Sequence, residues 1–532
     1  MSDYSPIAQI FCRYIKKPLP GHFRPGTGFT DCRAKQQGNG TAKCYASMDI
    51  SLYPDQVIRI GREFEHNDIA IHHPYISRSH FVIYSVEYGE GMQPLVYVRD
   101  CNSLAGTYVD SKSSQSVKLS TPSGHVLSQG EIIRLEPYWE FHVYLLDAPP
   151  MNLTNPLAPS ETDLFRDRFI ISERILGNGG LARVHLAVNL NTGRQVACKI
   201  HRLDHFRQFQ RPSSTIRRIL DETNILSRLN HPNVLKFEAA FRSPTTLYTF
   251  TELATGGDLF SMRLAQPDAL LEMDTKIIIR QVVEAVTYLH EQGVTHRDLK
   301  PENIFFATGP APRARVIVGD LGFAKVNKSS RMASRVGTQR FMAPEIYHNQ
   351  SYGAKVDIWS IGMISLFLVI IDWDSLGRFE TFDQITIDKG LKEVFGDPSG
   401  TCENLSDDFK DFVRACLVLK SSKRMTARAS KGHNWFRSSE SQLMAQIETF
   451  AREWQPAQVV HNSVEDLDLL EDMDTENITL IKAPKKRKRL DDELDIENSR
   501  PSHYFREGDS TIHEHQHKPT TVSPIFELTQ FT

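Results

Sequence analysis

The sequence lacks the cysteine pattern of a disulfide-bonded or zinc-binding protein. Its 532 residues include seven cysteines, an odd number, and no two of them are spaced as Cys-x-x-Cys. Scattered cysteines of this kind fit free thiols in a reducing compartment. The sequence also lacks a large excess of one charge, because its 62 Lys and Arg residues nearly balance its 65 Asp and Glu residues. Direct binding to nucleic acid or to a membrane surface is therefore not expected.

Long apolar runs are missing as well. The first 25 residues contain no apolar core of a secretory signal. The longest apolar run is IWSIGMISLFLVII, residues 358–371, whose 14 residues fall short of the roughly 18–20 needed to cross a bilayer. We interpret this run as a buried helix and expect a soluble intracellular protein without a membrane partner.

The chain is too long for one hydrophobic core, and its patterns change along its length. Residues 1–50 have few periodic apolar positions and are predicted to be poorly structured. Residues 51–147 contain short alternating runs separated by turn residues, which predicts an all-β sandwich. Residues 148–164 contain four prolines and are predicted to form a linker.

The remaining sequence divides into a folded region and a tail. Residues 165–437 begin with strand patterns and become helical after about residue 254, which predicts a small β-rich lobe followed by a large helical lobe. Within 438–532 a helix is expected to continue after Phe436. Blocks of acidic and basic residues follow, and such blocks typically stay disordered.

Residues 165–437 carry the groups that phosphoryl transfer requires, in a consistent order. The segment GNGG follows a strand, and its glycines would let backbone N–H groups close over phosphates. Lys199 ends the strand VACK, and Glu222 on the next helix offers it a partner. Each feature alone also fits a common turn or a surface charge. The segment HRDLKPEN, residues 296–303, and DLG, residues 320–322, follow in the same order and carry further charged and polar residues.

With HRDLKPEN in place, residues 165–437 resemble the eukaryotic protein kinases, which have a two-lobed α+β fold. The resemblance implies that Asp298 is the catalytic base and that Lys300 steadies the moving phosphoryl group of ATP. It implies Asn303 and Asp320 as ligands of Mg²⁺. The implied ATP-binding positions are Gly177, Gly179, Val184, Ala197, Lys199, Glu222, Glu252, Ala254 and Asp258.

Two positions depart from the kinase pattern. Ala182 replaces the third glycine of the phosphate loop, and Leu321 replaces the phenylalanine of DFG; both are expected to tune activity without abolishing it. The motif DLKPEN, with Lys300 at its third position, resembles that of the serine/threonine kinases and implies transfer to serine or threonine. Asp258 and Glu302 as substrate-facing carboxylates would favour Arg or Lys about three residues before the target. Alternatively, Asp258 binds only the ribose of ATP.

Three segments in the predicted sandwich, GR, SRSH and DCNSLAGTYV, lie at expected strand ends. A phosphothreonine is bound by an arginine, hydroxyls and backbone N–H groups that converge at loop tips. Together the three segments resemble the forkhead-associated (FHA) module. The resemblance implies that Arg62 and Ser77 hold the phosphate beside Arg78, while His80 braces the loop. Ala105 replaces a family asparagine that holds the peptide, which would cost about 1–2 kcal/mol.

An FHA module followed by a kinase resembles the DNA-damage checkpoint kinases, and among them the meiosis-specific FHA kinases of fungi. The resemblance implies recruitment to phosphothreonine on a chromosomal adaptor, in a nuclear, chromosome-associated protein of the meiotic recombination checkpoint that suppresses repair between sister chromatids. It implies self-association during trans-autophosphorylation of Ser334 and Thr338, with Arg297 receiving the phosphate. Arg331 lies three residues before Ser334, so this serine resembles the enzyme's own preferred site.

The block PKKRKR, residues 484–489, resembles a one-part nuclear import signal whose lysines bind acidic grooves of importin. An ordinary solvated charge run is the alternative. Two other functions also stay open at this point. One is a general mitotic DNA-damage or replication checkpoint kinase, and the other is a phosphopeptide-binding adaptor with a weak kinase lobe.

Overall fold

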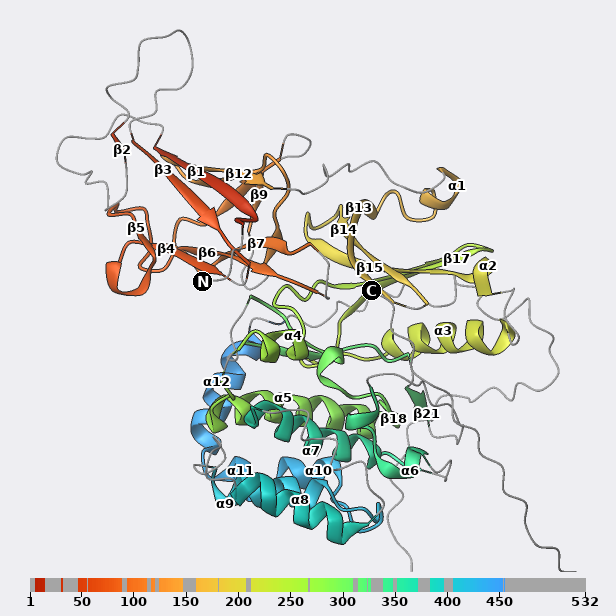
Figure 1. Ribbon diagram of the computed structural model, residues 1–532. Coiled ribbons are helices and arrows are strands. Elements are labelled where there is room, and N and C mark those ends of the chain that lie inside the picture. The colour runs from red at the N-terminus through yellow and green to blue at the C-terminus, as the bar shows by residue number, and fades with distance from the viewer. Residues whose placement is uncertain are drawn as a thin grey trace, which may run out of the picture. The chain divides into compact units, whose positions relative to one another are not determined.

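The computed structural model forms one compact unit over Met1–Asp472, and a second unit covers Met473–Thr532. All described residues lie in the first unit (Figure 1). The described ranges are 5–14, 30–31, 46–54, 56–88, 93–111, 116–119, 124–146, 159–179, 181–206, 212–266, 268–309, 314–322, 324–326, 338–347, 352–371, 383–396, 405–452 and residue 454. The predicted import signal at 484–489 and the disorder predicted for the tail lie outside them.

Two sheets pack face to face in the N-terminal region, as the alternating pattern predicts. One contains, in spatial order, β2 (Thr30–Asp31), β3 (Ala46–Leu52), β1 (Ala8–Tyr14), β12 (Trp139–Leu145), β11 (Ile132–Leu135), β8 (Tyr108–Asp110) and β9 (Val117–Lys118). The other contains β10 (His125–Val126), β7 (Leu95–Asp100), β6 (Phe81–Val86), β4 (Val57–Gly61) and β5 (Ile69–Ala70). Their inner faces share one buried apolar cluster.

The prediction that residues 1–50 are poorly structured is wrong for the segment Ala8–Tyr14. This segment is β1, which pairs with β12 on one side and β3 on the other. Its side chains alternate in burial, with Ala8, Ile10, Cys12 and Tyr14 in the sandwich core. The alternation covers only seven residues, is interrupted by the apolar Phe11, and is followed by a glycine-rich sequence, so it gives a weak signal. The sandwich therefore begins before residue 51.

The small lobe is an antiparallel sheet with one long helix. Its strands are, in spatial order, β13 (Phe169–Asn178), β14 (Arg183–Asn189), β15 (Gln195–Arg202), β17 (Thr246–Glu252) and β16 (Phe237–Arg242). The helix α3 (Pro212–Leu226) lies along this sheet in Figure 1, after the single turn α2 (Leu203–Phe206). Another short helix, α1 (Pro159–Thr162), precedes the sheet and overlaps the predicted linker.

The large lobe is helical, as predicted, and buries α7 (Val356–Val369) at its centre. Every residue of α7 is buried, which confirms the interpretation of the apolar run at 358–371 as a core helix. No helix of the described chain is long and apolar enough to cross a membrane. The other helices are α4 (Leu259–Leu264), α5 (Glu272–Glu291), α6 (Pro344–Tyr347), α8 (Gln384–Gly396), α9 (Asp407–Cys416), α10 (Ala427–Lys431), α11 (Asn434–Arg437) and α12 (Glu440–Arg452).

Short elements of the large lobe carry the catalytic segments. They are β18 (Val294–Thr295) paired with β21 (Lys325–Val326), β19 (Ile304–Phe306) paired with β20 (Val316–Val318), and the turns η3 (Pro301–Asn303) and η4 (Thr338–Phe341). The helix expected after Phe436 is α12, whose Leu443 packs into the core of this lobe.

A buried ion pair connects two distant parts of the large lobe. The Arg424 side chain is fully buried, and its Nη1 and Nη2 donate to Oε1 and Oε2 of Glu345 at 2.7 and 3.1 Å. The same guanidinium donates to the carbonyl oxygens of Lys355 and Val418. Removing one partner would leave an uncompensated charge in the core.

Arg424→Met should therefore destabilise the large lobe by about 3–5 kcal/mol, because the Glu345 carboxylate would remain buried without its cation. Lys389→Met is the matched control, since the Lys389–Glu393 pair is exposed and should contribute less than about 1 kcal/mol. Urea unfolding of each variant, with hydrogen exchange of the α7 amides as the probe, measures the loss of stability. Equal stability of the two variants would contradict this account.

Candidate functional site

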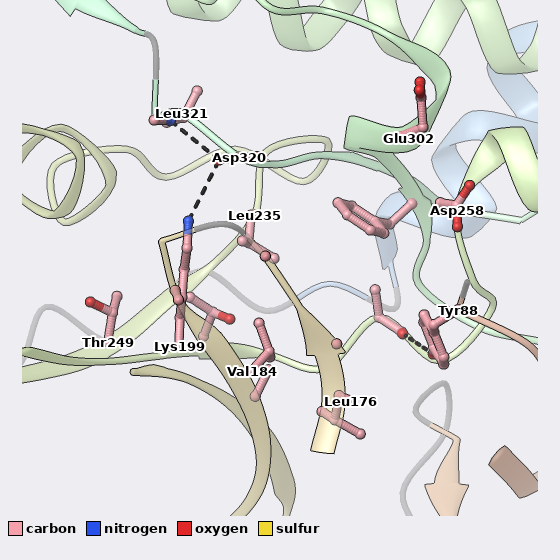
Figure 2. A pocket seen from close by; sticks show the side chains of 18 of the residues that line it. Tyr88, Leu176, Val184, Lys199, Leu235, Thr249, Asp258, Glu302, Asp320 and Leu321 are labelled. Atoms are coloured by element: carbon pink, nitrogen blue, oxygen red, sulfur yellow. Dashed lines mark hydrogen bonds and ion pairs between the residues drawn. The ribbon is translucent and has the colours of Figure 1, made fainter. Parts of the chain in front are cut away.

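A cavity of about 1530 Å³ opens beneath the glycine turn that joins β13 and β14. Figure 2 shows part of its wall, with Lys199 and Asp320 at one end and Tyr88 and Asp258 at the other. All nine predicted ATP-binding residues line it. They are Gly177, Gly179, Val184, Ala197, Lys199, Glu222, Glu252, Ala254 and Asp258, joined by Asp320 and Glu302 from the large lobe.

The cation that the sequence predicts at a strand end lies inside β15 and is held by two carboxylates. Lys199 Nζ lies 2.7 Å from Glu222 Oε1 on α3 and 3.5 Å from Asp320 Oδ1. Burial disfavours the charged amine, but these two carboxylates outweigh it and raise the pKa of Lys199. The ammonium in turn is the main reason that the pKa of Asp320 is lowered. Lys199 and Asp320 are thus both charged at neutral pH, as binding of a metal–nucleotide complex requires.

The catalytic loop is fixed by a buried aspartate at the start of α7. Asp357 accepts hydrogen bonds from the backbone N–H groups of His296 (2.9 Å) and Arg297 (2.8 Å), and its Oδ2 is 2.8 Å from His290 Nε2. Arg297 has φ = 70°, a left-handed conformation that a side chain rarely adopts. The loop maintains this strained turn next to Asp298, and strain of this kind is concentrated at functional sites.

Asp298, Lys300 and Asn303 converge, as the motif predicts. Lys300 Nζ lies 3.3 Å from Asp298 Oδ2, and Asn303 Nδ2 donates to the Asp298 carbonyl oxygen at 2.7 Å. Burial raises the pKa of Asp298, while the nearby Lys300 opposes the rise. A carboxylate held in this way can accept a proton from a substrate hydroxyl. Phosphoryl transfer is therefore chemistry that these side chains can perform.

The two predicted metal ligands provide oxygen atoms, which suit a hard divalent cation. Because the amide nitrogen of Asn303 donates to Asp298, its amide oxygen is the atom that would bind metal. Asp320 has φ = 54°, and its Oδ1 accepts from the N–H of Gly322 at 3.4 Å. The residues present fit the expected metal, which would neutralise phosphate charge when bound.

The two predicted substrate-facing acids share the cavity wall, but their surroundings differ. Asp258 is the N-cap of α4, and its two carboxylate oxygens accept from Ser261 N and Oγ, both at 2.8 Å. Glu302 belongs to the turn η3 next to Asp298. Burial raises the pKa of both carboxyls. This capping role was not assigned to Asp258 from the sequence. An Asp directly before a helical run, as in GGDLF, is nevertheless a general N-cap signal.

The two departures from the kinase pattern are accommodated locally. Leu321 is 2% exposed and belongs to the large-lobe core, so an apolar residue fills this position as expected. The carbonyl oxygen of Ala182 accepts from the N–H of Gly179 at 2.8 Å, which closes the turn over the cavity. Neither change removes a charged group that phosphoryl transfer needs.

Of the predicted regulatory residues, the structure describes two. Thr338 begins the turn η4, and the Arg297 guanidinium lies over the ring of Tyr352 at 5.2 Å. Ser334 lies outside the described residues. Its regulatory role and the role of Arg297 as its phosphate partner remain predictions.

The predicted phosphothreonine-binding residues lie together at one end of the sandwich. The backbone N–H of Arg62 donates to the carbonyl oxygen of Ser77 at 2.9 Å, and Ser77 Oγ accepts from Leu104 N at 3.0 Å. The Arg62 side chain is exposed, whereas Arg78 Nε is 3.1 Å from Glu63 Oε1. His80 is fully buried, and its Nδ1 accepts from Ser77 N at 3.1 Å. His80 thus braces the loop, which confirms the prediction.

A buried aspartate that was not singled out from sequence shapes the facing loop. Asp100 accepts from the N–H and hydroxyl of Ser103 and from the hydroxyl of Thr107. These bonds hold the turn that places the Leu104 N–H against Ser77. Asp directly after a strand and before Ser and Thr is a general turn signal, so it gave no functional indication.

Asp298→Asn should lower kcat by at least about 100-fold, because the amide cannot accept the substrate proton. Nucleotide affinity should stay unchanged, since Asp298 does not line the cavity wall formed by the residues named above. Phosphate transfer and binding of a non-hydrolysable ATP analogue provide the two measurements. Asp204→Asn, at an exposed acid paired with Arg202, is the control. Activity within twofold of the parent would contradict the assignment.

Comparison with protein families agrees with both parts of the chain. Residues 170–436 match the protein kinase domain, and residues 58–136 match the FHA domain. Both matches fall within the boundaries predicted from sequence. An FHA domain implies phosphothreonine peptides as partners, and a kinase domain implies protein substrates, ATP and a divalent metal.

Curated relatives include the "Meiosis-specific serine/threonine-protein kinase mek1" of Schizosaccharomyces pombe, which is 33% identical over 70% of this chain and 80% of its own length. Calcium/calmodulin-dependent protein kinase type 1 of Macrobrachium nipponense is 34% identical over 51% of this chain and 75% of its own. The type IV enzyme of Homo sapiens is 34% identical over 52% and 56%. The chain therefore belongs to the serine/threonine protein kinases that carry an FHA domain and resemble the fungal meiosis-specific kinase.

Proposed function

We propose that this kinase is recruited through its FHA domain to a phosphothreonine-bearing adaptor on meiotic chromosomes. There it acts in the recombination checkpoint and suppresses repair from the sister chromatid. The observation that carries the proposal is the similarity to a kinase named as meiosis-specific, because it extends over 70% of this chain and so beyond the kinase domain. The calmodulin-dependent kinases match over only about half of the chain.

The geometry of the FHA loops supports recruitment by a phosphorylated ligand. The Arg62 backbone bonds to the Ser77 carbonyl, and His80 locks the loop of Ser77, so the two loops that carry the arginine and the hydroxyl are held together before any ligand binds. Pre-organisation of this kind lowers the entropic cost of binding. The replacement of the family asparagine by Ala105 would weaken the grip on the peptide backbone without affecting the phosphate contacts.

Recruitment would also activate the enzyme. Tethered copies on one adaptor could reach an effective concentration of about a millimolar, so that one kinase phosphorylates the activation segment of its neighbour. Ser334 and Thr338 are the proposed sites, with Arg297 at the base of the catalytic loop as the cation for the new phosphate. The metal in this reaction is proposed to be Mg²⁺, which commonly bridges two carboxyl or amide oxygens and nucleotide phosphates.

The position of Glu302 supports a preference for basic substrates. It follows the catalytic Asp298 in the same loop and lines the cavity together with Asp258. Because Asp258 already caps α4 through both of its oxygens, Glu302 is the carboxylate that we assign to an arginine about three residues before the target.

Glu302→Gln should reduce the preference for arginine over alanine at this peptide position by about tenfold, the ratio expected for loss of one charge-assisted hydrogen bond of about 1.4 kcal/mol. A positional peptide library with ATP measures the ratio. Glu291→Gln, at an exposed acid near the end of α5, should leave it unchanged. If the parent enzyme shows no preference for arginine at this position, the assignment of Glu302 is wrong.

Nuclear import is proposed for the block at 484–489. Its five basic residues follow a proline in the form that importin binds, and a chromosomal role requires entry into the nucleus. A mitotic checkpoint kinase would need the same signal. The timing of expression separates the two roles. Protein present in mitotic cells under DNA damage would favour the mitotic checkpoint kinase over the meiotic one.

Imaging a tagged chain in meiotic cells separates recruitment from import. Arg62→Ala should abolish chromosomal foci and reduce Ser334 phosphorylation, measured by mass spectrometry, while the protein stays nuclear. The double change Lys486→Ala and Arg487→Ala should lower the nuclear signal itself. Arg59→Ala, which removes an exposed arginine paired with Asp68, is the control and should behave like the parent. Foci that persist in Arg62→Ala would refute FHA-dependent recruitment.

A further inference from the structure

The strand β6 is buried along its whole length, although it belongs to a two-sheet sandwich with only one inner face. Phe81 and Ile83 lie in the sandwich core, as one face of an antiparallel strand should. The opposite face carries Val82, Tyr84 and Val86, which are at most 9% exposed. Something other than the sandwich must therefore cover the outer face of this sheet.

The kinase domain covers it. The residues on this face form one buried cluster with small-lobe residues of β13 and β14. From the sandwich come Val82, Tyr84, Val86, Leu95, Tyr97 and Val126, and from the small lobe Leu176 and Leu186, with Val184, Ala197 and Leu253 at the edge. At the rim, the side-chain amide of Gln195 bonds both ways with the backbone of Val126, at 2.7 and 3.1 Å.

Two tyrosines of the FHA domain, Tyr84 and Tyr88, contact the segment 252–257 that joins the two kinase lobes, and Tyr97 packs against both of them. The rings of Tyr84 and Tyr97 stack with centroids 5.3 Å apart. The Tyr84 hydroxyl donates to Thr255 Oγ1 and accepts from Gly309 N, both at 3.2 Å. The Tyr88 hydroxyl is 2.7 Å from that of Tyr97 and donates to the carbonyl oxygen of Ala254 at 3.0 Å.

Glycines on the kinase side leave the space that these side chains occupy. A Cβ at Gly309 would lie 2.1 Å from Cζ of the Tyr84 ring, and one at Gly257 would lie 2.8 Å from Val86 Cγ1. On the FHA side, a Cβ at Gly124 would lie 2.6 Å from Thr255 Oγ1. The two surfaces thus fit each other where any larger residue would separate them.

Tyr88 extends this contact into the nucleotide cavity. It lines the cavity together with Leu176, Leu253 and Ala254, at the end away from Lys199 (Figure 2). Its hydroxyl engages the backbone carbonyl of Ala254, a residue of the ATP-binding set. Sequence comparison of kinase domains alone would not reveal this residue, because it belongs to the other domain.

We propose that the FHA domain of this chain is a wall of its nucleotide site. Tyr84 docks the domain on the segment between the lobes, and Tyr88 is a positioning residue that holds the Ala254 backbone for nucleotide binding. Tyr88 would position the Ala254 backbone whether or not a phosphopeptide is bound to the FHA domain. The inference is therefore independent of the proposed recruitment.

A steric pair tests the docking. Gly309→Ala places a methyl group against the Tyr84 ring and should weaken binding of a non-hydrolysable ATP analogue about three- to tenfold, while hydrogen exchange at 252–257 increases. Adding Tyr84→Ala removes the ring, so the double variant should be less impaired than the sum of the two single changes. Gly396→Ala, which meets no atom within 4 Å, is the control. Additive effects, or a Gly309→Ala variant that behaves like Gly396→Ala, would overturn the docking.

A second pair tests Tyr88. Tyr88→Phe keeps the ring and removes the hydroxyl that bonds to the Ala254 carbonyl and to the Tyr97 hydroxyl, so it should raise both the Kd of the analogue and the KM for ATP about two- to threefold with kcat unchanged. Tyr88→Ala should increase both further. Tyr144→Phe alters a half-exposed tyrosine on the other sheet and serves as the control. If both Tyr88 variants bind nucleotide as Tyr144→Phe does, Tyr88 has no positioning role.

Discussion

The charge cluster of Lys199, Glu222 and Asp320 is the interaction on which the rest of the site depends. Lys199 comes from a small-lobe strand, Glu222 from the helix beside it, and Asp320 from the large lobe. Because the ammonium compensates both carboxylates, each charge can remain in a half-buried cavity where an isolated charge would be costly. The two lobes are thereby brought into the relation that a metal–nucleotide complex requires, with the phosphate-binding cation facing the metal-binding acid.

The opposite side of the site relies on rigidity instead of charge compensation. Asp357 is entirely buried, yet it stays ionised because two backbone N–H groups and His290 surround it, and these contacts lower its pKa despite the burial. The helix that carries Asp357 is itself buried on all sides, so the catalytic loop is attached to the core of the large lobe. Asp298 therefore has a fixed position relative to Lys300 and Asn303.

Sequence alone could predict the parts of the site that chemistry constrains locally. HRDLKPEN fixes Asp298, Lys300 and Asn303 within one loop, so their proximity follows from chain connectivity. The pairing of Lys199 with Glu222, 23 residues apart, was one candidate pair among the residues, and only the family resemblance made it a specific prediction. The strand at Ala8–Tyr14 was missed because both of its pairing partners, β3 and β12, are distant in the sequence, and nothing local marks either pairing.

The contact between the domains shows why some functional residues escape any motif. The segment FVIYSV of β6 has the continuous apolar character of a strand covered on both faces, whereas the neighbouring alternating runs belong to strands with a solvated face. That character reports burial but not what covers the strand. Only the three-dimensional arrangement places Tyr84 and Tyr88 against Ala254 and Thr255. The shared apolar cluster is the physical link on which our proposal depends, because through it changes at Tyr84 and Tyr88 would reach the nucleotide site without altering a catalytic residue.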